Sequence, residues 1–351
     1  MRREERGMLV ECASVQTVRA WVLLVSQEPT KSKSGQILID QRGGSLRNPK
    51  HREAGRDEIA ERFANLMTWK RGGERAPHKP LLALYALGRL SRGRGRLVRY
   101  AEAEAALRDL LREFGPVRRS VHPEHPFWRL QRDGVWEVQS RIPLRAKTGG
   151  TNPPRRELLR GESQGGFTPQ IDAALRRDPL LVRTIAHTLL DAHFPATLHE
   201  DILSAVGLEL EAPVYRRRPR NPTFRERVLI AYDQRCAICG FDVRLGGAQI
   251  GLDAAHIQWH QAGGPDTVEN GLALCVLHHK LFDRGAITVT DSFRVVLSER
   301  VHGGGGFDTY VLAFHGAPLR PPQSRRYLPA ASFLEWHWRE VFQGPARPEP
   351  R

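Results

Sequence analysis

Three cysteines and a histidine in the C-terminal half have the spacing of metal ligands. Cys236 and Cys239 form a C-x2-C pair, and Cys275 and His278 form a C-x2-H pair. Two tight turns of this kind present four sulfur and nitrogen ligands at zinc-bond distance. The chain shows no secretory signal and disulfides are rare in the cytosol, so this odd set of neighbouring cysteines favours metal over disulfide bonds. The sequence therefore predicts a structural Zn2+ site, with a buried thiol as the alternative for any one cysteine taken alone.

The same stretch contains a histidine, an asparagine and a second histidine in that order, His256, Asn270 and His279. Together with the zinc-ligand pattern around them, they resemble the HNH endonucleases, whose ββα-metal motif consists of two strands and a helix around one catalytic divalent cation. The resemblance extends from Arg235 to Gly285. It implies a metal-dependent DNA endonuclease that uses Mg2+, Mn2+ or another divalent cation.

Each residue type suits a step of phosphodiester hydrolysis, which needs a base for water, a cation at the scissile phosphate and stabilisation of the leaving oxygen. The resemblance implies that His256 is the general base, and the near-neutral pKa of an ordinary histidine suits that role. The resemblance also implies that Asn270 holds the loop together and helps to orient His256. His279 follows the zinc ligand His278 on a predicted helix, where adjacent side chains point about 100° apart. We therefore expect His279 to hold the catalytic cation.

One position departs from the family pattern. Many HNH enzymes carry Asp or His directly before the base, whereas this chain has Ala255. Asp253 is the nearest upstream carboxylate, but strand alternation points it away from His256. Asp253 would reach the catalytic cation only if the strand ended or bulged there, and a structural hydrogen-bonding role is an equal alternative.

The charge balance favours a nucleic-acid partner. The 351-residue chain has 54 Lys and Arg residues against 39 Asp and Glu residues, a formal net charge of +15. Such a protein is attracted to phosphate backbones, and counterion release supplies much of the affinity. A generally basic proteome is the alternative explanation. No apolar run is long enough to span a membrane, so we expect a cytoplasmic protein of two or three domains that acts on double-stranded DNA.

The elements that would position a DNA-recognition site precede the nuclease motif. Helical spacing of apolar residues begins near Asp57 and recurs over residues 77–90 and 101–114. Short strands are expected at residues 127–131 and 135–138. The Asp133-Gly134 pair between them predicts a hairpin, because Asp-Gly favours such turns.

This layout resembles the sulfur-binding domain of the McrA-like, phosphorothioate-dependent type IV restriction endonucleases. The residues that carry the resemblance are R-A-P-H-K-P-L-L-A-L-Y-A-L-G-R-L at 75–90, H-P-F-W-R-L at 125–130 and G-V-W-E-V at 134–138. The similarity extends over residues 57–175 and implies a domain that recognises phosphorothioated DNA. The expected fold class is therefore α+β, with a mainly helical recognition domain followed by a ββα-metal (HNH) nuclease domain with a zinc knuckle.

Recognition of a phosphorothioate requires a cavity for sulfur, which is larger, softer and more weakly hydrated than the oxygen it replaces. His125 and Pro126 offer an imidazole face and a ring without an N–H, although the family often has an aromatic residue in place of His125. The phosphate remains anionic and needs cationic or N–H donors. His78 and Lys79 stand at a predicted helix N-terminus, which favours anions, and Arg75 precedes it. The alternatives are an ordinary strand entry for His125-Pro126 and a solvated loop charge for Arg75.

The segment between the two motifs contributes two further candidate phosphate contacts, Arg155 and Arg156, on a proline-rich loop. Helices are expected over residues 171–175, 181–194 and 195–208, with Gly207 after the last of them. A basic, proline-bounded linker follows at 215–222, either as a DNA-backbone contact or as a solvated tether. The expected domains are a loose or disordered extension (1–56), the recognition domain (57–175), a helical connector with the linker (176–222), the nuclease domain (223–345) and a tail (346–351).

These observations together predict a modification-dependent restriction endonuclease that binds phosphorothioated DNA and hydrolyses nearby phosphodiester bonds. Two alternatives stay open. One is an HNH endonuclease that reads another DNA mark or none, and the other is a non-catalytic DNA-binding sensor with a degenerate HNH motif. A reader of a flipped base would need an aromatic-lined pocket. The sequence leaves the oligomeric state open, a dimer included.

Overall fold

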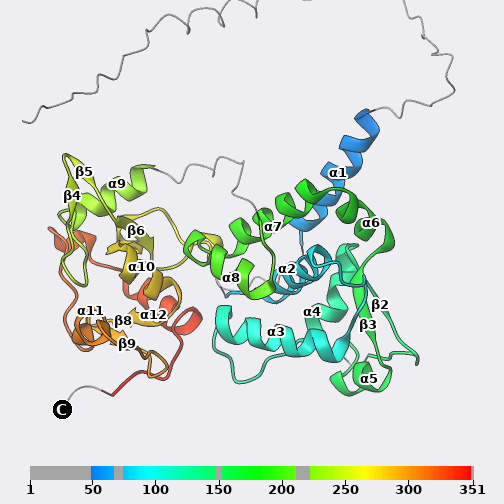
Figure 1. Ribbon diagram of the computed structural model, residues 1–351. Helices are drawn as coiled ribbons and strands as arrows, with labels where there is room; N and C mark the ends of the chain where they lie inside the picture. Colours follow the sequence, from blue (N-terminus) through cyan, green and yellow to red (C-terminus); the bar gives the residue numbers. More distant parts are fainter. Residues whose placement is uncertain (1–48, 67–73, 147–151, 211–221, 349–351) are drawn as a thin grey trace, which may run out of the picture. The chain divides into compact units, whose positions relative to one another are not determined.

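The computed structural model describes residues 49–66, 74–146, 152–210 and 222–348 (Figure 1). The expected N-terminal extension up to residue 48, nearly all of the basic linker and the last three residues of the tail lie outside the described residues. Within the described ranges, no helix combines the length and the hydropathy that a membrane crossing requires. Helices and small antiparallel sheets occur in both halves, which confirms the predicted α+β class.

The N-terminal half is a mainly helical domain. Its helices are α1 (Pro49–Ala64), α2 (His78–Ser91), α3 (Tyr100–Phe114), α4 (Glu124–Arg129), α5 (Arg155–Arg160), α6 (Pro169–Arg177), α7 (Pro179–His193) and α8 (His199–Val206), with 3-10 turns η1 (Leu130–Asp133) and η2 (Ala196–Leu198). The predicted helices at 77–90 and 101–114 are confirmed as α2 and α3. Leu81, Leu84 and Leu87 are fully buried, so α2 passes through the core. Pro80 in its first turn breaks no internal hydrogen bond.

A three-stranded sheet lies beside these helices, formed by β1 (Val98–Arg99), β2 (Trp136–Gln139) and β3 (Gln164–Phe167) in the order β1-β3-β2. Both pairings are antiparallel, with Trp136 opposite Phe167. The predicted hairpin at Asp133-Gly134 is wrong, because β2 pairs with β3 and not with the segment before it. Gly134 does turn the chain, at φ 68°, but the turn leads from η1 into the strand.

The expected strand at 127–131 is also wrong, because these residues form the end of α4 and the first half of η1. Phe127 and Leu130 are 1% and 0% exposed. This three-residue spacing puts both side chains on one face of a helix, whereas a strand would point them to opposite faces. Pro123 and Pro126 both lie at the start of the helix, where a missing N–H costs nothing.

The helical domain continues beyond residue 175. Its hydrophobic core includes Leu175 of α6, Ile185 and Leu189 of α7, and Ile202 of α8. Gly88 allows α2 and α8 to pack closely, since a Cβ at this position would lie 2.1 Å from the Val206 carbonyl oxygen. Helices α6, α7 and α8 therefore pack with α2, although the sequence analysis placed residues 176–222 in a connector.

The nuclease half contains α9 (Pro222–Ala231), β4 (Arg244–Leu245), β5 (Ala248–Gln249), β6 (Leu252–His256), η3 (His260–Ala262), η4 (Val268–Asn270), β7 (Gly271–Cys275), α10 (Val276–Asp283), β8 (Ile287–Val289), β9 (Val295–Leu297), α11 (Phe307–Tyr310), η5 (Leu312–Phe314), η6 (Arg325–Tyr327) and α12 (Ala331–Glu340). β6 and β7 pair without interruption from Leu252↔Cys275 to His256↔Gly271. α10 follows β7 directly. These two strands and one helix form the predicted ββα unit.

The two halves share a buried charge cluster around Glu340, at the end of α12. Glu340 is fully buried, and its carboxylate oxygens lie 2.8 and 2.9 Å from the Arg118 guanidinium. The Arg75 N–H donates to the same carboxylate, and the Arg75 guanidinium lies 3.9 Å from the centre of the Trp259 ring. Burial alone would raise the pKa of Glu340, but hydrogen bonds from these arginines hold it below its ordinary value. The buried charge is thus compensated by residues of the recognition domain.

We expect Glu340→Gln to lower the free energy of unfolding by roughly 2–3 kcal/mol, less than a fully buried pair would lose because Arg118 is partly solvated. A carboxylate whose folded pKa is depressed stabilises the protein above the unfolded pKa. The wild type loses that stability as pH falls below about 4.5, so the difference between the two proteins should shrink there. Denaturant titrations at pH 7 and pH 4 measure both effects. The exposed Glu335→Gln is the control, and an unchanged midpoint for Glu340→Gln would contradict the expectation.

Candidate zinc centre and nuclease site

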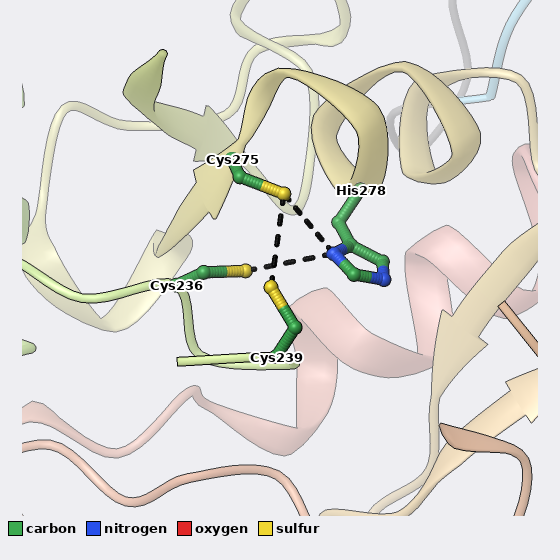
Figure 2. Close-up of side chains that lie close together, drawn as sticks. All are labelled: Cys236, Cys239, Cys275 and His278. Carbon is green, nitrogen blue, oxygen red and sulfur yellow. Dashed lines mark hydrogen bonds between the residues drawn. The ribbon is translucent and has the colours of Figure 1, made fainter. Parts of the chain in front are cut away.

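The four predicted zinc ligands come from three segments of the nuclease domain (Figure 2). Cys236 and Cys239 lie on the turn after α9, Cys275 is the last residue of β7, and His278 lies in the first turn of α10. Their side chains point toward a common centre, and the four ligand atoms lie within 4.8 Å of one another. The fold therefore brings together all four residues that the spacing predicted.

The distances between the four ligand atoms match those expected around a tetrahedral zinc ion. Zn–S and Zn–N bonds of about 2.3 and 2.0 Å separate two sulfurs by about 3.8 Å and a sulfur from a nitrogen by about 3.5 Å. In the protein, the Sγ atoms of Cys239 and Cys275 lie 3.9 Å apart. His278 Nδ1 lies 3.7 Å from Cys236 Sγ and 3.1 Å from Cys275 Sγ. The cluster fits a zinc knuckle.

The hydrogen bond on the far side of the His278 ring sets its orientation. His278 Nε2 lies 3.1 Å from the Tyr310 carbonyl oxygen, to which it donates, so Nδ1 faces the cluster. Burial lowers the pKa of His278, but hydrogen bonds to Cys236 and Cys239 outweigh it and raise the value to about 9. The negative charge that attracts a proton to the histidine would equally attract Zn2+.

The His256 ring is held by an aromatic ring against one face and by a carboxylate at one edge. His256 ends β6, its ring stacks on Phe224 with ring centroids 4.0 Å apart, and its Nε2 lies 2.8 Å from Asp266 Oδ1. The His256 side chain is 19% exposed, so solvent reaches it. Asp266 was missed by the sequence analysis, although its position between His256 and Asn270 was a usable signal.

Asn270 is fully buried and spans the loop that follows His256. Its Oδ1 accepts from the Gln258 N–H at 2.8 Å, and its Nδ2 donates to the carbonyl oxygens of Gln258 and Pro265, both at 3.0 Å. A Cβ at Gly264 would lie 1.9 Å from the Gln258 carbonyl oxygen, so glycine permits this close approach. One side chain thus fixes both ends of the loop beside His256.

His279 lies on α10 next to the zinc ligand and is 6% exposed. Its Nε2 lies 3.2 Å from Asp283 Oδ2, one helical turn later. Burial would raise the pKa of Asp283, but the charge and hydrogen bond of His279, with a hydrogen bond from Thr197, lower it below its usual value. Asp283 was also missed, and its spacing of four residues from His279 was the available signal.

Asp253 does not meet the condition for reaching a cation beside His256. The β6–β7 ladder runs from Leu252 to His256 without a bulge. The Asp253 carboxylate lies 3.0 Å from Arg225 Nε and accepts from the Ala254 N–H at 2.9 Å. These contacts agree with the alternative in which Asp253 has a structural hydrogen-bonding role.

Two of the candidate phosphate contacts are used inside the protein. Besides its contacts with Glu340 and Trp259, the Arg75 guanidinium donates to the Phe114 carbonyl oxygen, and burial lowers the pKa of Arg75 to about 9. Lys79 is 8% exposed, with Nζ 2.6 Å from a carboxylate oxygen of Asp133. Arg75 and Lys79 therefore both have partners inside the protein, and their contact with DNA stays a prediction.

His78 and His125 lie close enough to affect each other's charge. Burial, followed by the proximity of His125, lowers the pKa of His78 to about 4, so the His78 ring is neutral at pH 7. The His125 side chain is 40% exposed and stacks on His122, with ring centroids 5.0 Å apart. Pro126 is buried one residue further along α4. The neutral His78 ring therefore adds no charge to this part of the protein.

Arg155 and Arg156 begin α5 and are both exposed. Arg155 is bonded through Nε to Glu104, a buried carboxylate that also binds Arg108 at 2.9 Å. Half of the Arg155 side chain is nevertheless accessible. Arg156 therefore offers the more available charge of the two.

The geometry defines an HNH-type nuclease unit braced by a Cys3His cluster and joined to a helical domain. Two family models match the chain. The ScoMcrA-like DNA sulfur-binding domain matches residues 56–211, and the HNH endonuclease family matches residues 236–290. The chain therefore carries the two kinds of domain that the sequence resemblance implied, a ScoMcrA-like DNA sulfur-binding domain followed by an HNH endonuclease domain.

Solved structures similar to this chain include sulfur-binding domains. That of ScoMcrA complexed with phosphorothioated DNA is 26% identical, with 43% of this chain and 95% of that chain covered and a TM-score of 0.39. That of SprMcrA, also with phosphorothioated DNA, is 22% identical, with 44% and 94% covered and a TM-score of 0.37. The type IV phosphorothioation-dependent restriction endonuclease ScoMcrA is 23% identical, with 43% of this chain but 32% of that chain covered and a TM-score of 0.36. A comparison with curated proteins found no match.

We expect purified protein to contain one equivalent of zinc and Cys239→Ser to lose it. Structural zinc contributes directly to folding free energy, so the variant should also unfold at a lower temperature. Elemental analysis and thermal melts test both expectations. Cys12→Ser, which removes the one cysteine outside the C-x2-C and C-x2-H pairs of the sequence, is the control and should retain the metal. Full zinc occupancy in Cys239→Ser would contradict the assignment.

Proposed function

We propose that this protein is a modification-dependent restriction endonuclease that recognises phosphorothioated DNA and hydrolyses nearby phosphodiester bonds at its HNH site. The observation that carries the proposal is the presence, in one chain, of a DNA sulfur-binding domain and an HNH unit with His256, Asn270 and His279 in place. The net charge of +15 suits a DNA substrate.

In the proposed mechanism His256 is the general base. Its Nε2 donates to Asp266, which assigns the proton of the neutral ring to Nε2 and directs Nδ1 toward accepting a proton from water. The carboxylate also stabilises the imidazolium that forms after transfer, as in other His–Asp pairs. Phe224 and the loop fixed by Asn270 hold the ring in this orientation.

His279 is the residue that would hold the catalytic cation, through the ring nitrogen that does not face Asp283. A bound Mg2+, Mn2+ or similar cation supplies Lewis-acid stabilisation of the phosphoryl and leaving oxygens. Zinc in the Cys3His cluster would have the separate role of fixing the first turn of α10, which carries His279. Asp253 is left out of the ligand set because it is engaged by Arg225.

For recognition, we propose that His78, His125 and Pro126 form the surface that meets the sulfur. A neutral His78 ring close to His125 disfavours a hydrated oxygen more than a weakly hydrated sulfur. Arg156 and the accessible part of Arg155 would contact the DNA backbone.

Two alternatives make different predictions for one experiment. An HNH endonuclease that reads another mark, or none, would cut methylated or plain duplexes as well as phosphorothioated ones. A non-catalytic sensor would bind and cut nothing. Cleavage of matched phosphorothioated, methylated and plain duplexes with Mg2+ or Mn2+ should therefore yield products from the phosphorothioated duplex alone.

His256→Ala should abolish cleavage of the phosphorothioated duplex while zinc content, thermal stability and DNA binding stay near the wild-type values. Loss of a general base lowers the rate by about 100-fold to 10,000-fold. Single-turnover cleavage measures the change. His302→Ala replaces an exposed histidine of the same domain and should cut normally, whereas wild-type cleavage by His256→Ala would mean that another residue is the base.

Two substitutions should separate sulfur recognition from charge neutralisation. In full-length protein inactivated by His256→Ala, adding His125→Ala should reduce the affinity ratio between phosphorothioated and plain duplexes. Adding Arg156→Ala should weaken both equally and reduce the slope of log K against log salt by about 1. Binding titrations at two salt concentrations provide these values. Equal affinity of the parent protein for the two duplexes would exclude sulfur recognition.

A further inference from the structure

Helix α10, which carries the proposed cation ligand His279, makes ion pairs and hydrogen bonds with the recognition domain. Lys280 Nζ lies 2.8 Å from Asp201 of α8 and donates to the Thr197 carbonyl oxygen. Arg284, directly after α10, lies 2.8 Å from Glu113 of α3. These contacts fix the position of η2, which contains Thr197, against α10.

Within this contact, one buried carboxylate joins the recognition domain to His279. Asp283 is 3% exposed, and its Oδ2 lies 3.2 Å from His279 Nε2. The Thr197 hydroxyl donates to the same Oδ2. Thr197 and His279 therefore both donate to Asp283, which joins the two domains.

From this arrangement we propose that Thr197, a residue of the recognition domain, is a positioning residue for the nuclease reaction. Its hydroxyl holds the Asp283 carboxylate in the orientation that fixes the His279 imidazole. The inference rests on the proposed function, in which His279 holds the catalytic cation. It adds that the nuclease site is completed by the sulfur-binding half of the chain.

The physical reason lies in how a histidine ligand is oriented. A carboxylate that accepts from one ring nitrogen fixes the tautomer and the ring plane, and it raises the basicity of the other nitrogen. A buried carboxylate oxygen keeps a single orientation only when its donors are in place. Thr197 provides one of these donors, and the bond from Lys280 to its carbonyl oxygen holds Thr197 itself.

Three threonine substitutions test the proposal in full-length, zinc-loaded protein. Thr197→Val keeps the shape and removes the hydroxyl, Thr197→Ser keeps the hydroxyl, and Thr188→Val removes a hydroxyl that donates only to the Thr184 carbonyl oxygen within α7. The readouts are Mn2+ affinity, measured by the loss of the free-Mn2+ paramagnetic resonance signal, and single-turnover cleavage as a function of Mn2+ concentration. Zinc content, melting temperature and binding of phosphorothioated duplex are measured alongside.

We expect Thr197→Val to weaken Mn2+ binding about 10-fold to 100-fold, the range typical of residues that orient a metal ligand. Cleavage should require correspondingly more Mn2+, with zinc content and duplex binding unchanged. Thr197→Ser should restore both values, and Thr188→Val should match the wild type. A purely structural interface would instead lower the melting temperature and leave Mn2+ affinity unchanged.

The proposal is overturned if Thr197→Val binds Mn2+ with wild-type affinity, or if Thr197→Ser is as impaired as Thr197→Val. His279→Ala separates this failure from a failure of the proposed function. If His279→Ala loses Mn2+ binding while Thr197→Val does not, only the positioning role is wrong. If His279→Ala keeps wild-type Mn2+ affinity and cleavage, the cation ligand itself has been misassigned.

Discussion

The arrangement of the nuclease site depends on the convergence of three cysteines and His278 on one point. These ligands belong to three separate segments, the turn after α9, the end of β7 and the first turn of α10. α10 has only eight residues, too few for a helix to be stable by itself in water. Its place must come from tertiary contacts, and a metal in the Cys3His cluster would fix its first turn. Because His279 is the next residue after His278, that constraint also determines where the proposed cation ligand points.

Both ends of α10 are constrained. Its C-terminal end is held by the ion pairs of Lys280 and Arg284 with the recognition domain, and by Gly285. At Gly285, φ is +69° and a Cβ would lie 2.0 Å from the Val341 carbonyl oxygen, so a side chain at that position would push α12 away. An eight-residue element therefore links the metal cluster, the proposed catalytic histidine and the DNA-recognition half. A substitution that breaks any of these contacts is therefore expected to change the position of His279.

The predictions that succeeded rested on local signals. The C-x2-C and C-x2-H spacing identified the metal cluster, and continuous apolar residues identified α2. Partners that are distant in sequence could not be predicted from such signals. The position of Lys79 at a helix start predicts a phosphate contact, but its ion-pair partner in the fold, Asp133, is far along the sequence. Arg75 likewise contacts Glu340 from the other half of the chain. The segment around Phe127 was misassigned because five residues fit either period, and only the buried face of the fold decides between them.

Because of these internal partners, the net charge overstates how many basic residues are available to bind DNA. Composition alone suggests that any of 54 basic residues could meet DNA, yet several well-placed ones already neutralise buried carboxylates. Arg118 compensates Glu340, and Arg108 and Arg155 compensate Glu104. Removing such a residue would leave an unpaired buried charge, so its effect on DNA binding would be mixed with a loss of stability. The DNA-binding contribution of charge is therefore best measured at exposed positions such as Arg156, where a change in salt dependence reports on the phosphate contact.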